Sequence, residues 1–359
     1  MDGPLLANLL CILAWTAPLF LLPGSVVLLT WPHGAPTVGA GLAIMAALVL
    51  GPASWQCRLS LYALLLALSS PLHTAAAYAA AAALAAMLAM TTSRPGGPDA
   101  CAPSPRFCRL LTHVLDGRAY FARCELRGAL EALPPARMLL AAHPHGIFAA
   151  GWSWNLFWNF ALHERAGRIG FLMDANLRLT SPSFRLLCDW YAAPTRWAGA
   201  ATKDVIKRAM AGGESIALLP GGFQEATICK RGADRVYVRK RTGFIKYCLQ
   251  EGYAIVPAYT FGESDLYSTF NGLMGVRLWL AKRNIPAVAM LGDWRCPLLP
   301  YRDVPLVTCI GRPLQLPRIA EPTSADVEEW HAKYIAALQT TFEENKAQAG
   351  RPDAVLELW

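Results

Sequence analysis

Charged residues are scarce in this chain, and its first hundred positions have almost none. Asp, Glu, Lys and Arg make up 16% of the 359 residues, whereas soluble domains contain about 25%. The first hundred positions hold two bases, Arg58 and Arg94, and two acids, Asp2 and Asp99. This composition excludes an ordinary soluble surface for that region. The remaining chain carries the whole net charge of +8 and is long enough for one α/β domain.

Motifs of several enzyme and binding classes are also missing. The ten cysteines include no Cys-x-x-Cys pair and have no His-x₃₋₅-His partner, which excludes a zinc site of the usual spacing. We therefore expect no bound metal and mostly buried, structural thiols. The segments around Ser153, Ser215 and Ser264 lack the closing glycine of Gly-x-Ser-x-Gly, which argues against a hydrolase with a nucleophile elbow. There is no dinucleotide fingerprint, Walker loop or recognised nucleic-acid motif, so we expect no nucleic-acid partner.

Two long apolar regions fill the N-terminal part. Leu5 to Leu22 approaches the roughly 20 residues that span a bilayer, and a second region runs from Val38 to Met90. No base lies in the first region or before it, which disfavours a cleaved signal peptide. We expect residues 1–90 to be a retained transmembrane anchor, a hairpin of two or three helices. Residues 91–105 are predicted to be a linker, and the positive-inside rule places the large basic domain, residues 106–359, in the cytosol.

Beyond the linker, short apolar runs alternate with amphipathic segments. Helices are predicted from Thr202 to Gly212, from Thr242 to Glu251, and from about Ser324 onward. This alternation predicts βαβ units, and therefore an α/β fold with a mixed, largely parallel sheet flanked by helices. The predicted strands are Met138–Ala142, Arg168–Met173, Ser215–Leu219, Ala254–Phe261 and Pro305–Ile310.

The first candidate for chemistry is His143-Pro144-His145-Gly146, which follows the apolar run 138–142. Its proline and glycine turn the chain at the C-terminal end of a predicted strand, where open α/β sheets tend to bind ligands. Imidazole is the side chain best suited to accept a proton near neutral pH. Two histidines at one strand end indicate an acid–base site, although structural loop histidines give the same pattern.

A second motif has the same construction. Pro220-Gly221-Gly222 follows the strand predicted at 215–219, and Glu225 comes within one helical turn. Adjacent glycines let backbone N–H groups approach a substrate and line an oxyanion site. Glu225 is placed to orient a histidine from the neighbouring strand end. A tight turn followed by a solvated glutamate is the alternative.

Two further stretches leave alternatives open. Residues 230–246 hold seven bases and a single acid, Asp234. They form either a solvated face or a site for phosphates or anionic headgroups. The aromatic run from Trp152 to Phe160 is either part of the core or the wall of a membrane-facing pocket.

Together these motifs resemble the type-2 diacylglycerol acyltransferase family, which includes monoacylglycerol and wax-alcohol acyltransferases. The resemblance covers nearly the whole chain, and the His-Pro-His-Gly motif is its most specific element. Phe223-Gln224 departs from the two alanines that animal members often have. The matching segments, in family order, are the apolar N-terminal region, His143–Gly146, Asn176-Leu177-Arg178, Pro220-Gly221-Gly222 with Glu225, Arg241-Thr242-Gly243-Phe244, Phe261-Gly262-Glu263, Val307–Pro313, and Pro322-Thr323 before a helix carrying His331 and Tyr334.

The resemblance implies a glycerolipid-acyltransferase-like domain that esterifies diacylglycerol to triacylglycerol with acyl-CoA, at the endoplasmic reticulum membrane. A histidine base would remove the proton of the acceptor hydroxyl. We favour His145 as this base, with His143 supporting it and Glu225 orienting it. The other implied contacts are backbone N–H groups for the oxyanion at Gly146, Gly221 or Gly222, and cations for the CoA phosphates at Arg239 and Arg241.

Under this interpretation acyl-CoA is a substrate and no cofactor is needed. The implied partners are acyl-CoA, a neutral-lipid acceptor and the bilayer, while homo-oligomer formation and lipid-droplet association stay open. Monoacylglycerol and long-chain alcohols are alternative acceptors. A non-catalytic lipid-binding protein of the same fold is a further alternative, but such a protein needs no base. The two histidines and Glu225 therefore favour an enzyme.

Overall fold

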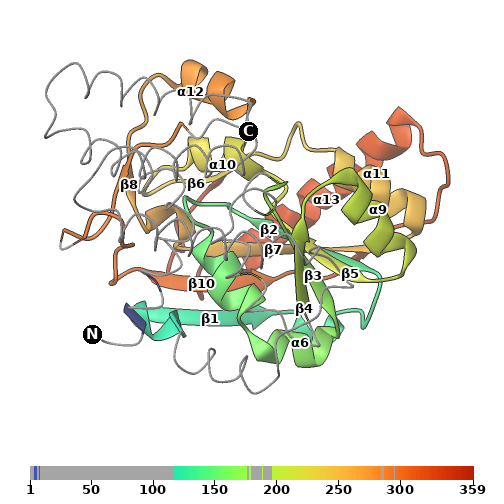
Figure 1. The fold of residues 1–359 in the computed structure, drawn as a ribbon, viewed down its shortest axis with the longest axis horizontal. Coiled ribbons are helices and arrows are strands. Elements are labelled where there is room, and N and C mark those ends of the chain that lie inside the picture. The colour runs from blue at the N-terminus through green and yellow to red at the C-terminus, as the bar shows by residue number, and fades with distance from the viewer. Residues whose placement is uncertain are drawn as a thin grey trace, which may run out of the picture.

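An eight-stranded sheet forms the centre of the structure (Figure 1). The computed structural model describes residues 4, 5, 8, 116–175, 178, 188, 196–283, 287–294 and 296–359. Seven strands lie in the order β1-β10-β7-β2-β5-β3-β4, and β11 pairs with β7. Their bounds are β1 Arg123–Gly128, β2 Met138–His143, β3 Ile169–Met173, β4 Arg196–Ala200, β5 Ser215–Leu218, β7 Ala254–Phe261, β10 Pro305–Ile310 and β11 Leu314–Gln315.

All five predicted strands are present as β2, β3, β5, β7 and β10. The neighbours β7, β2, β5, β3 and β4 are parallel, whereas β10 runs antiparallel to β7. The prediction of a mixed, largely parallel sheet is therefore confirmed. The edge strands β1 and β4 were not predicted, because β1 alternates charged and apolar residues and β4 contains glycine and alanine rather than a β-branched run.

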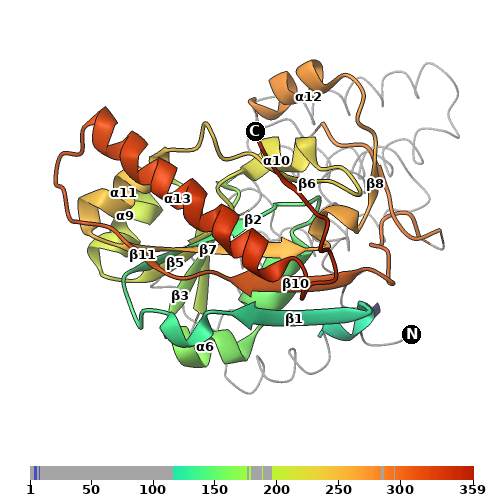
Figure 2. The ribbon, with the colours of Figure 1, turned by 180° about the vertical axis from the view of Figure 1, so that it is seen from behind.

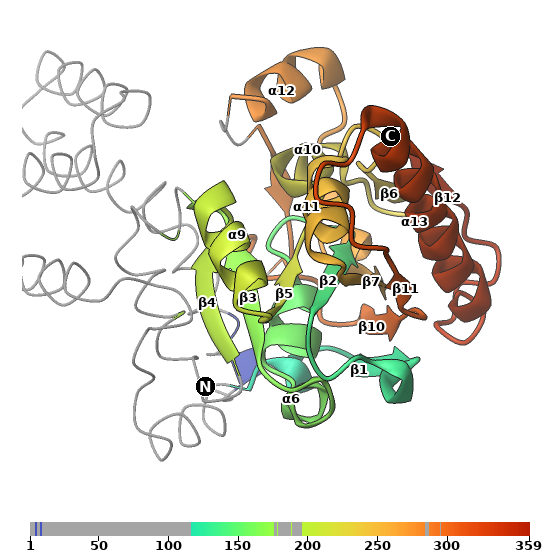
Figure 3. The ribbon, with the colours of Figure 1, turned by 90° about the vertical axis from the view of Figure 1, so that its right-hand side faces the viewer.

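Residues of β2 alternate between two apolar cores on opposite faces of the sheet, as the period of a strand requires. Met138, Leu140 and Ala142 pack with the aromatic run on one face, while Leu139 and Ala141 pack on the other. The first face is covered by the π-helix η4 and by α6, and the second by α9, α11 and α13 (Figure 3). The helix bounds are η4 Trp152–Phe157, α6 Phe160–Ala166, α9 Lys203–Ala211, α10 Gly222–Ile228, α11 Gly243–Glu251, α12 Met274–Ala281 and α13 Ser324–Asn345. Short 3-10 turns add η2 Arg118–Tyr120, η3 Leu130–Ala132 and η5 Glu263–Asp265.

The three predicted helices are confirmed as α9, α11 and α13. The Thr202 hydroxyl caps α9 by accepting from the N–H of Val205, and α11 ends at Gly252 in the left-handed conformation. Thr323 and Asp326 form a reciprocal capping box at the start of α13. This capped helix then crosses the back of β7 and β10 (Figure 2).

The aromatic run belongs to the core, which settles one of the open alternatives. Trp152, Trp154 and Trp158 are at most 4% exposed. Asn155 within the run is also buried, and its amide donates to Thr308 and to the Leu306 carbonyl. These residues therefore offer no free surface to a membrane.

The predicted anchor (1–90) and linker (91–105) lie outside the described residues except at Pro4, Leu5 and Asn8. Asn8 is buried: its amide donates to the Gly117 carbonyl at 3.0 Å and accepts from the Trp154 indole at 3.1 Å. Within the described ranges, no helix has both the length and the apolar character needed to cross a bilayer.

Two small sheets complete the described chain. β6, Asp234–Val236, pairs in parallel with β12, Leu356–Leu358. β8, Ser268–Thr269, pairs antiparallel with β9, Met290–Leu291. The six described cysteines are free thiols, as expected, and four of them are buried.

Candidate active site

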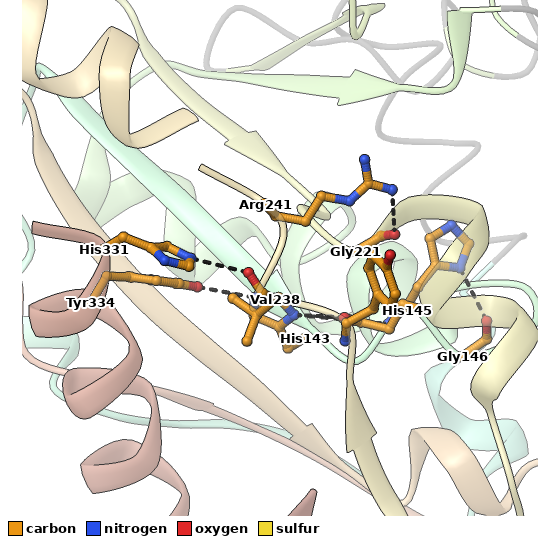
Figure 4. A network of polar contacts seen from close by, with 10 residues as sticks. His143, His145, Gly146, Gly221, Val238, Arg241, His331 and Tyr334 are labelled. Atoms are coloured by element: carbon orange, nitrogen blue, oxygen red, sulfur yellow. Dashed lines mark hydrogen bonds and ion pairs between the residues drawn. The ribbon is translucent and has the colours of Figure 1, made fainter. Parts of the chain in front are cut away.

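The two predicted motifs meet at one end of the sheet. β2 and β5 are parallel neighbours, so the His-Pro-His-Gly and Pro-Gly-Gly segments that follow them leave the sheet at the same edge. Figure 4 shows His143, His145, Gly146 and Gly221 gathered there, with Tyr334 approaching from α13. The sequence prediction that these segments lie together is therefore confirmed.

His143 is the last residue of β2 and is fully buried. Its Nδ1 lies 3.1 Å from both carboxylate oxygens of Glu225. Because a carboxylate only accepts, Nδ1 donates, and Nε2 forms a hydrogen bond with the hydroxyl of Tyr334 at 3.0 Å. Both ring nitrogens are thus engaged within the protein, and neither is free.

Glu225 lies in the first turn of α10 with 1% of its surface exposed. Besides His143, it accepts the backbone N–H groups of His145 and Tyr237, each at 2.7 Å. Burial alone would raise the pKa of this carboxyl, but the His143 ring and the two N–H donors outweigh it and hold the pKa below its usual value. The alternative of a solvated glutamate is therefore wrong.

His145 lies in the turn after β2 and is half-buried. Its Nδ1 donates to the carbonyl of Gly146 at 3.0 Å, which fixes the tautomer and leaves Nε2 unprotonated. Within the described residues, Nε2 makes no hydrogen bond. Burial lowers the pKa of His145, which keeps the ring neutral at physiological pH. Glu225 reaches His145 only through its backbone N–H, and the predicted carboxylate contact falls on the ring of His143 instead.

The three predicted oxyanion donors are not equivalent. Gly222 has a φ of +54° and its N–H donates to the Leu219 carbonyl at 3.2 Å, so it has no free N–H to offer. The N–H groups of Gly146 and Gly221 donate to no group in the described part of the chain. A Cβ at Gly221 would overlap the Glu225 carboxylate, which explains why glycine is needed there.

The two arginines predicted to meet the CoA phosphates also differ. Arg241 donates to the carbonyl of Gly221 at 3.1 Å and to the side chain of Gln224. Arg239 is exposed and donates instead to the Leu358 carbonyl in β12, at 3.1 Å. Arg241 therefore lies at the Pro-Gly-Gly turn, whereas Arg239 holds the C-terminal strand.

Glu263, in the Phe-Gly-Glu segment, was not predicted to belong to the site. It is 2% exposed and accepts the N–H groups of Ala150 and Gly151. A Cβ at Gly146 would overlap its carboxylate, so Glu263 lies directly beside the histidine turn. Burial raises the pKa of Glu263 to about 7. The sequence feature that could have identified Glu263 is its position directly after the strand predicted at 254–261.

Tyr334 and His331 were noted only as residues of the C-terminal helix. Tyr334 contacts the site through His143, as described above. His331, one turn earlier on α13, donates from Nε2 to the Val238 carbonyl at 3.0 Å, and burial lowers its pKa. Of the segment Asn176-Leu177-Arg178, only Arg178 is described; it is buried and donates to the Ala198 carbonyl at 3.3 Å.

Comparisons with known proteins identify relatives of this chain. A family model described as diacylglycerol acyltransferase matches residues 118–359. The chain is 29% identical over 244 residues to diacylglycerol O-acyltransferase 2 of Xenopus tropicalis, covering 62% of this chain and 64% of that protein. It is 28% identical over 252 residues to 2-acylglycerol O-acyltransferase 1 of Mus musculus (66% and 73% covered). It is also 28% identical over 265 residues to acyl-CoA wax alcohol acyltransferase 2 of Homo sapiens (68% and 75%).

Among solved structures, the chain aligns with the 1-acyl-sn-glycerophosphate acyltransferase PlsC from Thermotoga maritima. The alignment covers 90% of this chain and 95% of that one, at 12% identity and a TM-score of 0.36. These values are too low to add to an argument about fold or function.

Proposed function

Because the chain belongs to the diacylglycerol acyltransferase family, we propose that it transfers an acyl group from acyl-CoA to the free hydroxyl of diacylglycerol, making triacylglycerol. The observation that carries the proposal is the state of His145. Its ring is neutral, its Nδ1–H is held by the Gly146 carbonyl, and its Nε2 is free to accept a proton. A base of this kind is what attack by an alcohol on a thioester requires.

In the proposed reaction, Nε2 of His145 takes the hydroxyl proton as the alcohol oxygen attacks the thioester carbonyl carbon. The new C–O bond gives a tetrahedral intermediate with a negative oxygen. The C–S bond then breaks, the carbonyl re-forms, and the proton on His145 passes to the departing CoA sulfur. The products are an ester and free CoA, and the enzyme returns to its starting state.

The surrounding residues supply the remaining functions in this proposal. The N–H groups of Gly146 and Gly221 are the donors available for the negative oxygen, since that of Gly222 is engaged. Loss of one such donor typically costs about 10²–10³ in rate. Arg241, fixed at Gly221, is the cation placed for the CoA phosphates. Glu225 positions His145 by accepting the backbone N–H of His145.

The identity of the lipid that accepts the acyl group is the most specific part of the proposal. Relatives of this chain include proteins named for monoacylglycerol and wax-alcohol substrates, and both are alternative acceptors. Residues 1–90 carry the proposed anchor, which would place the domain on the cytosolic side of the endoplasmic reticulum membrane. Fractionation of cells expressing the full chain, with protease added to sealed microsomes, tests this: protection of the domain from external protease would overturn the orientation.

An acceptor panel tests the activity. Membranes containing the full chain are incubated with one labelled acyl-CoA and diacylglycerol, monoacylglycerol or a long-chain alcohol in turn. Triacylglycerol should be the main product, and a different ester would reassign the acceptor. Transfer to no acceptor would overturn the enzyme assignment.

The base is tested with His145→Gln. Loss of proton transfer should lower kcat by about 10²-fold or more. The matched control is His331→Gln, whose amide keeps a donor for the Val238 carbonyl and should leave kcat unchanged. The wild-type rate should stay constant on lowering the pH to 6.5 and fall only at more acidic pH, because the pKa of His145 is lowered. Full activity of His145→Gln would show that this residue is not the base.

A further inference from the structure

The exposed apolar surface of the described chain is concentrated in one segment. Seven large hydrophobic side chains in the described ranges are at least 53% exposed, and only Val355 lies elsewhere. The other six fall between residues 270 and 294. They are Phe270, Leu273, Val276, Trp279, Leu291 and Trp294.

This segment lies outside the sheet, between β7 and β10. It follows β8 and contains β9 and α12, and α12 stands beside α10 and apart from the central sheet in both Figure 1 and Figure 2. Val276 and Trp279 are three residues apart and share one side of α12, and Leu273 directly precedes the first residue of the helix. That side is the exposed one.

The polar groups of α12 face the protein instead. Arg277 is buried and donates to the carbonyls of Ala287, at 2.7 Å, and Thr227, at 2.9 Å. Gln224 on α10 donates to the carbonyl of Ala281 at 3.3 Å. The helix is therefore amphipathic with its apolar side outward, the reverse of a helix that packs on a core.

The charged residues beside this exposed apolar surface indicate which kind of partner binds it. Lys282 and Arg283 follow the last residue of α12, and the Arg283 guanidinium lies 3.7 Å from the centre of the Trp279 ring. The sequence between Leu266 and Tyr301 has a single acid, Asp293, and the exposed bases in its described part are Lys282 and Arg283, since Arg277 is buried. Tryptophan, leucine and phenylalanine bordered by Lys and Arg are typical of helices that lie in the interface of an anionic bilayer.

We propose that Phe270, Leu273, Val276, Trp279 and Leu291 form a docking face that inserts into the headgroup region of an anionic bilayer. This contact is separate from the anchor expected in residues 1–90. Because α12 packs on α10, docking brings the Pro-Gly-Gly turn and Glu225 close to the bilayer surface. A neutral-lipid acceptor, which is dissolved in the bilayer, then has a short path to His145; this last step rests on the proposed function.

Short-range quenching of tryptophan by brominated lipids tests the docking face. The full chain is reconstituted into vesicles of phosphatidylcholine with an anionic phospholipid, with bromine placed near the headgroup end of the acyl chains. The emission quenched by bromine should decrease in Trp279→Phe, because Trp279 is expected to contact the lipid. Phenylalanine keeps an apolar ring on the exposed side, so the variant should fold.

The matched control is Trp330→Phe on α13, where the half-buried indole lies against Lys333. Trp330→Phe should lower the total tryptophan emission, but the part of the emission that bromine quenches should stay equal to that of wild type. Equal quenched emission in wild type and Trp279→Phe would overturn the proposal and leave the face to another part of the chain or to a second copy. Since no substrate is added, this failure is distinct from failure of the proposed acyl transfer.

The basic border gives a second measurement. In Lys282→Gln/Arg283→Gln, quenching of Trp279 should become weaker in anionic vesicles and match that seen in purely zwitterionic ones. If neither the double substitution nor the removal of anionic lipid weakens the quenching, the proposal that the bilayer must be anionic is overturned.

Discussion

The hydroxyl of Tyr334 lies 3.0 Å from Nε2 of His143, although 191 residues separate the two in the sequence. This hydrogen bond joins the last residue of β2 to the C-terminal helix α13. With Glu225 on Nδ1, it occupies both nitrogens of the His143 ring. His143 therefore acts as a link between elements, and the neighbouring His145 keeps the nitrogen that is free for chemistry.

The Tyr334 contact predicts the effect of Tyr334→Phe. Removing the hydroxyl leaves the buried Nε2 of His143 without a hydrogen-bond partner, which should lower the free energy of unfolding by about 1–3 kcal/mol. The value of kcat should change little, and the pH at which kcat falls on the acidic side should not move, because His145 keeps its own contacts. Thermal unfolding in detergent and the pH dependence of kcat measure both quantities.

Tyr253→Phe is the matched control for this prediction. The Tyr253 hydroxyl donates to the carbonyls of Met210 and Glu214, at 3.0 and 2.9 Å, far from the histidines. Its loss should reduce stability and leave the pH profile unchanged. If Tyr334→Phe instead moves the acid limb of kcat, His143 takes part in proton transfer and the assignment to His145 is wrong.

Glu225 predicts a pH-dependent contribution to stability. The pKa of this carboxyl is lowered in the folded protein from an ordinary value of 4.5. The carboxylate thus stabilises the fold above pH 4.5, and this contribution is lost as the pH falls through the lowered pKa. Glu225→Gln should cost about 1–3 kcal/mol at pH 7, since an amide has a single acceptor oxygen.

The measurement is the difference in unfolding temperature between wild type and Glu225→Gln across the acidic range. The difference should narrow as the pH falls below 4.5. Exposed Glu164 provides the control, and Glu164→Gln should match wild type throughout. A difference that stays constant with pH would mean that the ionised carboxylate is not the stabilising form.

The elements with strong local signals could be predicted from the sequence. Apolar runs with nearby turn residues gave β2, β5 and β7. The capping residue Thr202 gave α9, and the helical spacing of apolar residues gave α13. The partner of Glu225 could not be predicted, because it depends on β2 continuing one residue further, to His143. That extra residue places His143 on the same face of the sheet as Leu139 and Ala141, toward α13.

Two other features also depend on tertiary contacts that no local pattern records. Tyr334 has helical spacing in common with Val327 and Leu338 and reads as an ordinary core residue. The segment of α12 carried no prediction, and the structure exposes its Val276 and Trp279. Burial of a helix side depends on which element covers it, and this is set by the packing of α12 on α10.

Arg241 and Arg239 should differ in their effect on acyl-CoA binding. Arg241 is fixed at the Pro-Gly-Gly turn, so Arg241→Gln should raise the KM for acyl-CoA by about 10-fold, the loss of one charge-assisted contact. Arg239→Gln removes only an exposed bond to the Leu358 carbonyl and should leave KM unchanged. Initial rates over a range of acyl-CoA concentrations measure this, and equal effects of the two variants would contradict it.

Gly146 predicts a steric effect on the histidine turn. Its φ is +59°, and a Cβ would overlap the Glu263 carboxylate. Gly146→Ala should therefore displace His145 and lower kcat by at least about 10-fold, which corresponds to about 1.4 kcal/mol in the activation free energy. Gly243→Ala is the control, because a Cβ there meets no atom within 4 Å. Unchanged kcat in Gly146→Ala would show that the turn tolerates the displacement.

Glu263 beneath that turn gives the last prediction. Burial raises its pKa from 4.5 to about 7, so the folded protein favours the neutral acid. The resulting destabilisation is absent below pH 4.5, grows as the pH rises from 4.5 to about 7, and is complete above it. Glu263→Gln carries no charge, so its stability relative to wild type should rise across this interval and then become constant. Unfolding temperatures of both proteins at matched pH values measure the change. A relative stability that is flat from pH 4.5 to 7 would mean that Glu263 titrates normally. It would also mean that the two backbone N–H groups of Ala150 and Gly151 compensate fully for its burial.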